Sequence, residues 1–209
     1  MLYLYIVRHG QTEWNAEGRI QGRLDSQLTE KGKEYAKLLG EKLQDVPFIQ
    51  IISSPSLRTM ATAEIIKGDR EISIIKDKNI MEMDLGTWQG STIEEIKSQF
   101  PEEYDCYRNR PDVYQNKDAE SFMDIKKRAE NFLEEFKKSP QNGNLLVVTH
   151  GLFIKSLFTI FKGIELKDIW TEPTVEGTSL TIVKLDEGHA EIMIEGDMSH
   201  LTGKGAALR

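Results

Sequence analysis

Two short apolar runs, each leading to a histidine that is followed by glycine, constrain this chain more than any other feature of its sequence. Residues Leu2–Val7 lead through an arginine to His9, and residues Asn144–Thr149 lead directly to His150. Both runs have the length and the aliphatic content of buried strands. The carboxyl ends of parallel strands meet at one edge of an open sheet, where ligands bind. We therefore expect His9 and His150 to lie at one ligand site.

The rest of the chain alternates between strand-like and helical patterns. Expected strands lie at residues 2–7, 48–53, 72–75 and 144–149, with a closing hairpin at 178–185 and 190–195, and expected helices include an apolar stripe at 38–43, a helix at 59–67 and a helix at 152–161. This alternation predicts an α/β fold with a mainly parallel central sheet and helices on both faces.

The length of the chain, 209 residues, suits one α/β domain, which we expect to span residues 1–202. The pattern at about residues 92–138 is mostly helical and is broken by Pro101 and Pro111, which are poorly accommodated within a helix. It predicts a helical insertion in this domain. Residues 203–209 are expected to form a flexible tail.

The composition limits which partners the protein can bind and which cellular compartment suits it. A net charge of −7 opposes the broad basic surface that nucleic acid or an anionic membrane requires, but it is compatible with a small positive pocket. The single cysteine, Cys106, allows neither an internal disulfide nor a thiolate metal cluster, which favours a reducing compartment. No apolar run is long enough to span a bilayer, and the first residues lack the features of a secretory leader. We expect a cytoplasmic monomer or homodimer.

The serines of residues 53–56 predict a helix start, where hydroxyl groups cap free backbone N–H groups, and they place Arg58 in the first turn. A guanidinium near a helix N-terminus suits phosphate oxygens. Taken alone, Arg58 is better explained as a surface salt-bridge partner. Either histidine taken alone is explained as well by a hydrogen-bonded core residue as by a ligand site. Both histidines together with Arg58 favour an anion site in which a neutral imidazole acts as nucleophile.

The motif Arg8-His9-Gly10-Gln11-Thr12-Glu13-Trp14-Asn15 resembles the signature of the histidine phosphatase superfamily, the phosphoglycerate mutase-like proteins. The similarity continues in the order of that family through Gly22, Leu28-Thr29-Glu30-Lys31-Gly32, Ser53-Ser54-Pro55-Ser56-Leu57-Arg58-Thr59, Glu82 with Gly86, Trp88 and Gly90, Thr149-His150-Gly151, and more weakly Gly196-Asp197 with Ser199-His200-Leu201. Because these motifs cover most of the chain, the resemblance implies the phosphoglycerate mutase-like fold for all of it.

The resemblance also implies roles for single residues. His9 is implied to accept the phosphoryl group, and Glu82 to donate a proton to the leaving oxygen and then to activate water. The implied residues around the phosphate and the substrate are Arg8, Asn15, Gln21, Arg58 and His150. Asp84, two positions further along the chain, is the rival for the acid. Independently of the resemblance, a phosphoryl group in transit needs several fixed donors and an in-line nucleophile.

No metal and no cofactor are expected, because no histidine or acid pair has the spacing of a zinc or two-metal site. The implied reaction is metal-independent hydrolysis of a small phosphorylated metabolite through a phosphohistidine. Phosphoglycerate, phosphoserine, a riboside phosphate of cobalamin synthesis and sugar phosphates are the candidates. A cofactor-dependent phosphoglycerate mutase is one alternative. Such mutases resemble this chain in their core, but they carry a longer stretch between the glutamate and the second histidine than this chain does. A non-catalytic phosphate-binding or interaction module is the other.

The segment at residues 100–114 contains Tyr104, Tyr107, Arg108 and Arg110, which are candidates for a lid over the non-phosphate part of a substrate. Ordinary packing of the tyrosines and a solvated face for the arginines is the simpler interpretation. The tryptophans Trp14, Trp88 and Trp170 are expected to pack in the core or at its edge rather than to contact a ligand.

Overall fold

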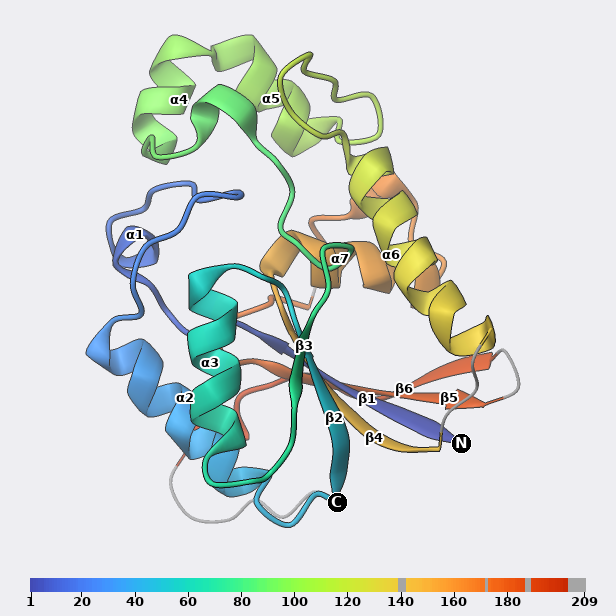
Figure 1. Cartoon of the computed structure of the whole chain (residues 1–209). Coiled ribbons are helices and arrows are strands. Elements are labelled where there is room, and N and C mark those ends of the chain that lie inside the picture. The colour runs from blue at the N-terminus through green and yellow to red at the C-terminus, as the bar shows by residue number, and fades with distance from the viewer. Residues whose placement is uncertain (139–141, 172, 187–188, 203–209) are drawn as a thin grey trace.

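The computed structural model describes residues 1–138, 142–171, 173–186 and 189–202, and its centre is one six-stranded sheet of order β3-β2-β4-β1-β5-β6 (Figure 1). The strands are β1 (Leu2–Arg8), β2 (Phe48–Ser53), β3 (Ile74–Lys76), β4 (Gly143–Thr149), β5 (Leu180–Asp186) and β6 (His189–Asp197). The pairs among β3, β2, β4 and β1 are parallel, whereas β5 pairs antiparallel with both β1 and β6. The mainly parallel sheet is therefore confirmed, with the predicted hairpin as its antiparallel edge.

Helices cover both faces of this sheet, as expected. The α-helices are α1 (Glu13–Ala16), α2 (Glu30–Lys42), α3 (Leu57–Lys67), α4 (Ile93–Gln99), α5 (Pro101–Asn109), α6 (Phe122–Lys138) and α7 (Gly151–Phe161), and the 3₁₀ turns are η1 (Gly86–Trp88), η2 (Leu166–Asp168) and η3 (Ser199–Leu201). Figure 1 shows α2 and α3 on one side of the strands and α6 and α7 on the other. This is the layered arrangement that α/β patterning predicts.

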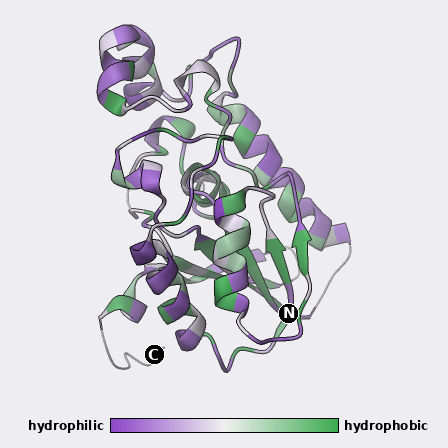
Figure 2. Ribbon diagram, turned by 60° about the vertical axis from the view of Figure 1, so that its left-hand side comes forward, coloured by the Kyte–Doolittle hydropathy of each residue, from purple (hydrophilic) through white to green (hydrophobic). Residues whose placement is uncertain are grey.

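The alternation of side chains along the central strands explains why two layers of helices form. In β4, Leu145 and Val147 join the apolar cluster under α6 and α7, whereas Leu146 and Val148 join the cluster under α2 and α3. All four side chains are fully buried. Because successive residues of a strand point to opposite faces, a strand that is apolar throughout needs cover on both sides. Figure 2 shows this continuous hydrophobic colouring along the strands, with hydrophilic residues on the outer faces of the helices.

The predicted helical insertion corresponds to α4, α5 and α6. Pro101 is the first residue of α5 and Pro111 follows its last turn, so neither proline interrupts a helix. The buried Trp88 packs against the rings of Tyr104, Tyr107 and two further aromatic residues, which joins the insertion to the segment before it. Residues 203–209, the expected tail, lie outside the described residues, and the proposed domain limits stay a prediction.

The cap of α3 differs from the expectation. The helix begins at Leu57, directly after the predicted serines, but its N-cap Ser56 makes no capping hydrogen bond with its side chain. The Asp25 carboxylate instead accepts hydrogen bonds from the backbone N–H groups of Leu57, at 3.0 Å, and Arg58, at 3.5 Å. The predicted serine cap is therefore wrong, because a carboxylate from a distant loop takes that place. Arg58 does lie in the first turn.

Candidate active site

The two histidines lie side by side at the carboxyl ends of β1 and β4. These strands are parallel neighbours, and their register pairs Arg8 with Thr149, the residues directly before His9 and His150. The backbone N–H of His9 donates to the Thr149 carbonyl at 2.9 Å, which extends the ladder by one residue. The ring centroids of the two histidines are 5.4 Å apart. The predicted meeting of the strand ends is confirmed.

The His9 ring is held in a neutral form with one unprotonated nitrogen. Its Nδ1 lies 2.8 Å from the Gly10 carbonyl oxygen, which can only accept, so Nδ1 carries the proton and Nε2 keeps its lone pair. The side chain is 3% exposed and lines the cavity at the strand ends. Burial lowers the pKa of His9 well below its usual value, and the positive charges of Arg58 and Arg8 lower it further. The imidazole is therefore uncharged at neutral pH.

His150 lies beside His9, is fully buried and does not line the cavity. Its Nδ1 accepts a hydrogen bond from Arg58 Nη2 at 3.1 Å, and its Nε2 donates to Ser54 Oγ at 2.8 Å. Burial, together with Arg58 and His9, lowers the pKa of His150 well below its usual value. The geometry makes His150 a neutral support for Arg58, and direct contact of His150 with a phosphate stays a prediction.

Both predicted arginines line the cavity and are fixed by other groups. The terminal nitrogens of Arg58 donate to the carbonyls of Gly22 and Leu24, to His150 and to the Asp25 carboxylate, with its Nη1 2.6 Å from Asp25 Oδ1. Arg8 donates from Nη1 to the Val175 carbonyl at 2.7 Å. The buried Nε atoms of Arg8 and Arg58 have no hydrogen-bond partner among the described residues. Unpaired N–H groups of this kind fit the oxygens of an anion.

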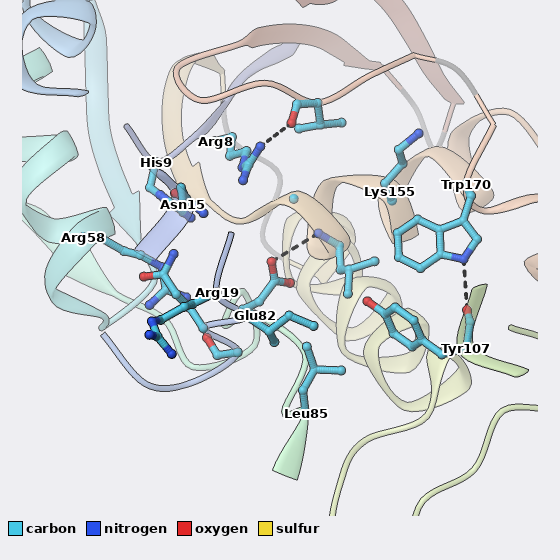
Figure 3. A pocket seen from close by; sticks show the side chains of 16 residues that line it. Arg8, His9, Asn15, Arg19, Arg58, Glu82, Leu85, Tyr107, Lys155 and Trp170 are labelled. Carbon is cyan, nitrogen blue, oxygen red and sulfur yellow. Dashed lines mark hydrogen bonds between the residues drawn. The ribbon is translucent and has the colours of Figure 1, made fainter. Parts of the chain in front are cut away.

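Glu82 supplies the carboxylate of the cavity. It lies on the irregular segment between β3 and η1, and its Oε2 accepts from the backbone N–H of Leu152 at 3.3 Å (Figure 3). The rival acid, Asp84, is turned to other partners: its carboxylate accepts from the Gly86 N–H at 3.0 Å and pairs with Arg23 at 3.6 Å. Asp84 does not line the cavity, so the structure favours Glu82 as the acid.

The cavity has a volume of about 300 Å³, and six of the seven predicted site residues line it, all except His150. Asn15 and Gln21 are among them. The amide oxygen of Asn15 accepts from the backbone N–H and the hydroxyl of Thr12, and that of Gln21 accepts from Ser26 Oγ at 3.2 Å. Because both amide oxygens are engaged, the amide NH₂ groups are the ends available to a ligand.

Several residues of the cavity wall carry no recognisable signal in the sequence. These are Arg19, Ile20, Leu85, Lys155, Trp170 and Val175. Trp170 was expected only to pack, but it both lines the cavity and donates from Nε1 to the Tyr107 carbonyl at 3.1 Å (Figure 3). Of the four lid candidates only Tyr107 lines the cavity, and Arg108 lies 4.3 Å from the centre of the Trp170 ring. Among the described residues no cluster of three or more His, Cys, Asp or Glu side chains is arranged to hold a metal ion.

Parallel strand ends that present a neutral imidazole between two guanidiniums, with one carboxylate nearby, define an α/β enzyme with a site for an anionic group. Comparison with known families agrees with this class. The sequence profile of the histidine phosphatase superfamily (branch 1) matches residues 4–197, and the chain belongs to this family. The resemblance in the motifs is thus confirmed, and the chain is an enzyme of the phosphatase class.

Relatives cover nearly the whole chain. Phosphoserine phosphatase 1 of Hydrogenobacter thermophilus is 32% identical over 96% of this chain and 95% of its own length, and a probable phosphoglycerate mutase, GpmB, of Salmonella choleraesuis is also 32% identical over the same shares. Among solved structures, YhfR of Bacillus stearothermophilus superposes with a TM-score of 0.93 at 39% identity, over 96% of this chain and 99% of that one. Phosphoserine phosphatase of Entamoeba histolytica, in a complex with phosphoserine, superposes with a TM-score of 0.83 at 28% identity, over 96% of this chain and 100% of that one.

No helix within the described ranges is long and apolar enough to cross a membrane.

Proposed function

We propose that this chain hydrolyses phosphomonoesters of small metabolites through a phosphohistidine formed on Nε2 of His9. The observation that carries the proposal is the state of the His9 ring: Nδ1 is committed to the Gly10 carbonyl, and the lowered pKa leaves Nε2 unprotonated near the guanidiniums of Arg8 and Arg58. A nucleophile in this state needs no separate base to activate it. The unpaired Nε–H groups of Arg8 and Arg58 supply donors for the phosphoryl oxygens.

The reaction divides into two transfers. In the first, the Nε2 lone pair forms a bond to phosphorus, the ester P–O bond breaks, and the leaving oxygen takes the proton of the Glu82 carboxyl group. In the second, the Glu82 carboxylate accepts a proton from water, the water oxygen attacks phosphorus, and the N–P bond breaks to release inorganic phosphate and neutral His9. Arg8 and Arg58 hold the charge of the phosphoryl oxygens throughout, because a loose transition state leaves that charge on the oxygens.

The size of the cavity, about 300 Å³, suits a small phosphorylated metabolite rather than a macromolecule. The names of the relatives point to phosphoserine as the first substrate to assay, and an Entamoeba histolytica phosphoserine phosphatase of 28% identity is also known in complex with 3-phosphoglyceric acid. Phosphoglycerate mutase activity is the second candidate, because the Salmonella relatives are named as probable mutases. Isomerisation of phosphoglycerate in the presence of bisphosphoglycerate, faster than its hydrolysis, would favour the mutase.

The proposal is tested by trapping the covalent intermediate. Wild-type protein is mixed with p-nitrophenyl phosphate, quenched in alkali and digested, and mass spectrometry should place the phosphoryl group on the peptide that contains His9. The variant His9→Ala should lose turnover by at least about a thousandfold. The matched control is His189→Ala, which removes an exposed histidine of β6 and should leave turnover unchanged. Equal rates for His9→Ala and wild type would refute the mechanism, and complete loss of activity in EDTA would contradict metal independence.

A further inference from the structure

We propose that Arg128 of α6, held by Glu120, is a positioning residue for Glu82: it clamps the backbone that carries this carboxyl group and so sets how well protons are delivered to the leaving oxygen. The inference rests on the proposed function of Glu82 as general acid. It gives the helical insertion a part in the chemistry, although neither Arg128 nor Glu120 lines the cavity.

The segment before Glu82 lacks the support of a sheet. β3 ends at Lys76, and no strand or helix holds the backbone from there to η1. Four successive backbone carbonyls, those of residues 79–82, instead accept hydrogen bonds from side chains. Arg128 donates to the carbonyls of Asn79 at 2.5 Å, Met81 at 2.8 Å and Glu82 at 3.2 Å. Thr149 Oγ1 donates to the remaining one, Ile80, at 2.7 Å.

Glu120 fixes the orientation of the Arg128 guanidinium. Its two carboxylate oxygens accept from Arg128 Nε at 2.9 Å and Nη2 at 2.8 Å, a bidentate pair in which both side chains are about one-sixth exposed. One oxygen also accepts from the backbone N–H of Asp84 at 2.9 Å. Burial alone would raise the pKa of Glu120, but hydrogen bonds from Arg128 and from the Asp84 N–H outweigh it and leave that pKa lowered. The pair therefore stays charged and planar near neutral pH.

The geometry explains why an arginine occupies this position. Five N–H donors in one rigid plane reach three carbonyls and a carboxylate together, whereas the ammonium of a lysine has three donors on a flexible stem. The contacts hold the backbone on both sides of the Glu82 Cα atom. Arg128 donates to the Met81 carbonyl before it and to the Glu82 carbonyl after it, and Glu120 accepts from the Asp84 N–H further along. A catalytic carboxyl group must be held to a fraction of an ångström, and displacement by about 1 Å costs on the order of a hundredfold in rate.

The test uses the requirement for an acid, which depends on the ester. An alkyl phosphate such as β-glycerol phosphate needs a proton on its leaving oxygen, whereas p-nitrophenyl phosphate releases a stable phenolate and needs it far less. The kcat/KM of each ester, which reports the first phosphoryl transfer, is measured for wild type, Arg128→Gln and Arg128→Lys. We expect the ratio of alkyl to aryl kcat/KM to fall by about tenfold or more in Arg128→Gln. The ratio should fall by less in Arg128→Lys, which keeps a charged group with N–H donors. Because both rates come from the same preparation, partial unfolding cancels from the ratio.

The matched control is Lys127→Gln, which changes the neighbouring residue of α6, whose side chain is 68% exposed. Its ratio should equal that of wild type. An unchanged ratio in Arg128→Gln, with Glu82→Gln lowering the ratio strongly, overturns the clamp and leaves the proposed function intact. An unchanged ratio in Glu82→Gln itself instead overturns the role of Glu82 in the proposed function.

Discussion

The proposed nucleophile, His9, and the proposed acid, Glu82, are held in opposite ways. His9 directly follows β1, a strand that lies between the parallel β4 and the antiparallel β5, and the backbone N–H of His9 continues the ladder. Glu82 lies on an irregular segment that is held largely by residues distant in the chain: Thr149, Leu152 and Arg128. Sheet hydrogen bonding therefore positions His9, while contacts with side chains position Glu82.

The two regions should therefore respond differently to substitution. Displacement of a strand end disturbs a ladder in which many backbone hydrogen bonds cooperate, so damage there affects folding as well as chemistry. Displacement of the Glu82 segment disturbs a few side-chain contacts and affects mainly proton transfer. Variants of the two regions should accordingly differ in kind: loss for all substrates in one region, and selective loss for esters with poor leaving groups in the other.

Arg58→Met should give the largest effect. The change removes a guanidinium that is 1% exposed and leaves Asp25, which is 20% exposed, without its charge partner. We expect kcat/KM to fall by about a thousandfold for alkyl and aryl esters alike, and the free energy of unfolding to fall by about 3 kcal/mol. Steady-state kinetics and urea unfolding measure the two effects. Arg110→Met is the control, because Arg110 is 61% exposed; an equal loss in that variant would contradict the assignment.

Glu82→Gln should give a smaller and selective effect. The amide keeps the shape of the side chain but carries no transferable proton, so we expect kcat/KM for β-glycerol phosphate, which reports the first phosphoryl transfer, to fall by about a hundredfold. The kcat/KM for p-nitrophenyl phosphate should change far less. Asp84→Asn is the matched control, since Asp84 does not line the cavity. A selective loss in Asp84→Asn instead of Glu82→Gln would exchange the roles of the two acids.

The glycines that follow the two histidines allow the two strand ends to be compared with each other. A Cβ atom on Gly10 would lie 2.7 Å from the Gly32 carbonyl oxygen, whereas a Cβ atom on Gly151 would meet nothing closer than Arg8 Nε at 3.6 Å. Gly10→Ala should therefore lower the free energy of unfolding by about 2 kcal/mol. Gly151→Ala should change it by less than about 1 kcal/mol. Urea unfolding of both variants measures the two changes in the free energy of unfolding. Equal losses of stability would mean that the close approach to Gly32 is unimportant.

The smallest effect concerns pH. Because the pKa of folded His9 lies below that of the unfolded chain, about 6.5, the unfolded state binds more protons as the pH falls. The contribution of this residue to stability is therefore complete above about pH 6.5 and is lost as the pH falls toward the folded pKa. Between pH 7.5 and 5.5, wild type should lose on the order of 1 kcal/mol more than His9→Gln. Urea unfolding of both proteins at both pH values tests this. Equal losses of stability in wild type and His9→Gln would show that the folded His9 is not held neutral.

Much of the strand-end region could be predicted from the sequence because its signals are local. The apolar runs predict β1 and β4, and the residues that follow them place both histidines at one edge of the sheet. The Glu82 segment was predicted only as an irregular region with a motif acid. The contact of Arg128 with residues 79–82 could not be predicted, because nothing in the spacing of an arginine on a helix indicates which loop its side chain meets.

Local patterns in the sequence specify the order of the elements, the apolar faces of the strands and the candidate site residues, since periodicity and motif are properties of neighbouring residues. The contacts of those side chains follow only from the folded chain: His150 accepts a hydrogen bond from Arg58, Asp25 caps α3, and Trp170 reaches the cavity. A hydrogen bond depends on the direction and distance between groups on separate elements, and packing of the whole chain sets both.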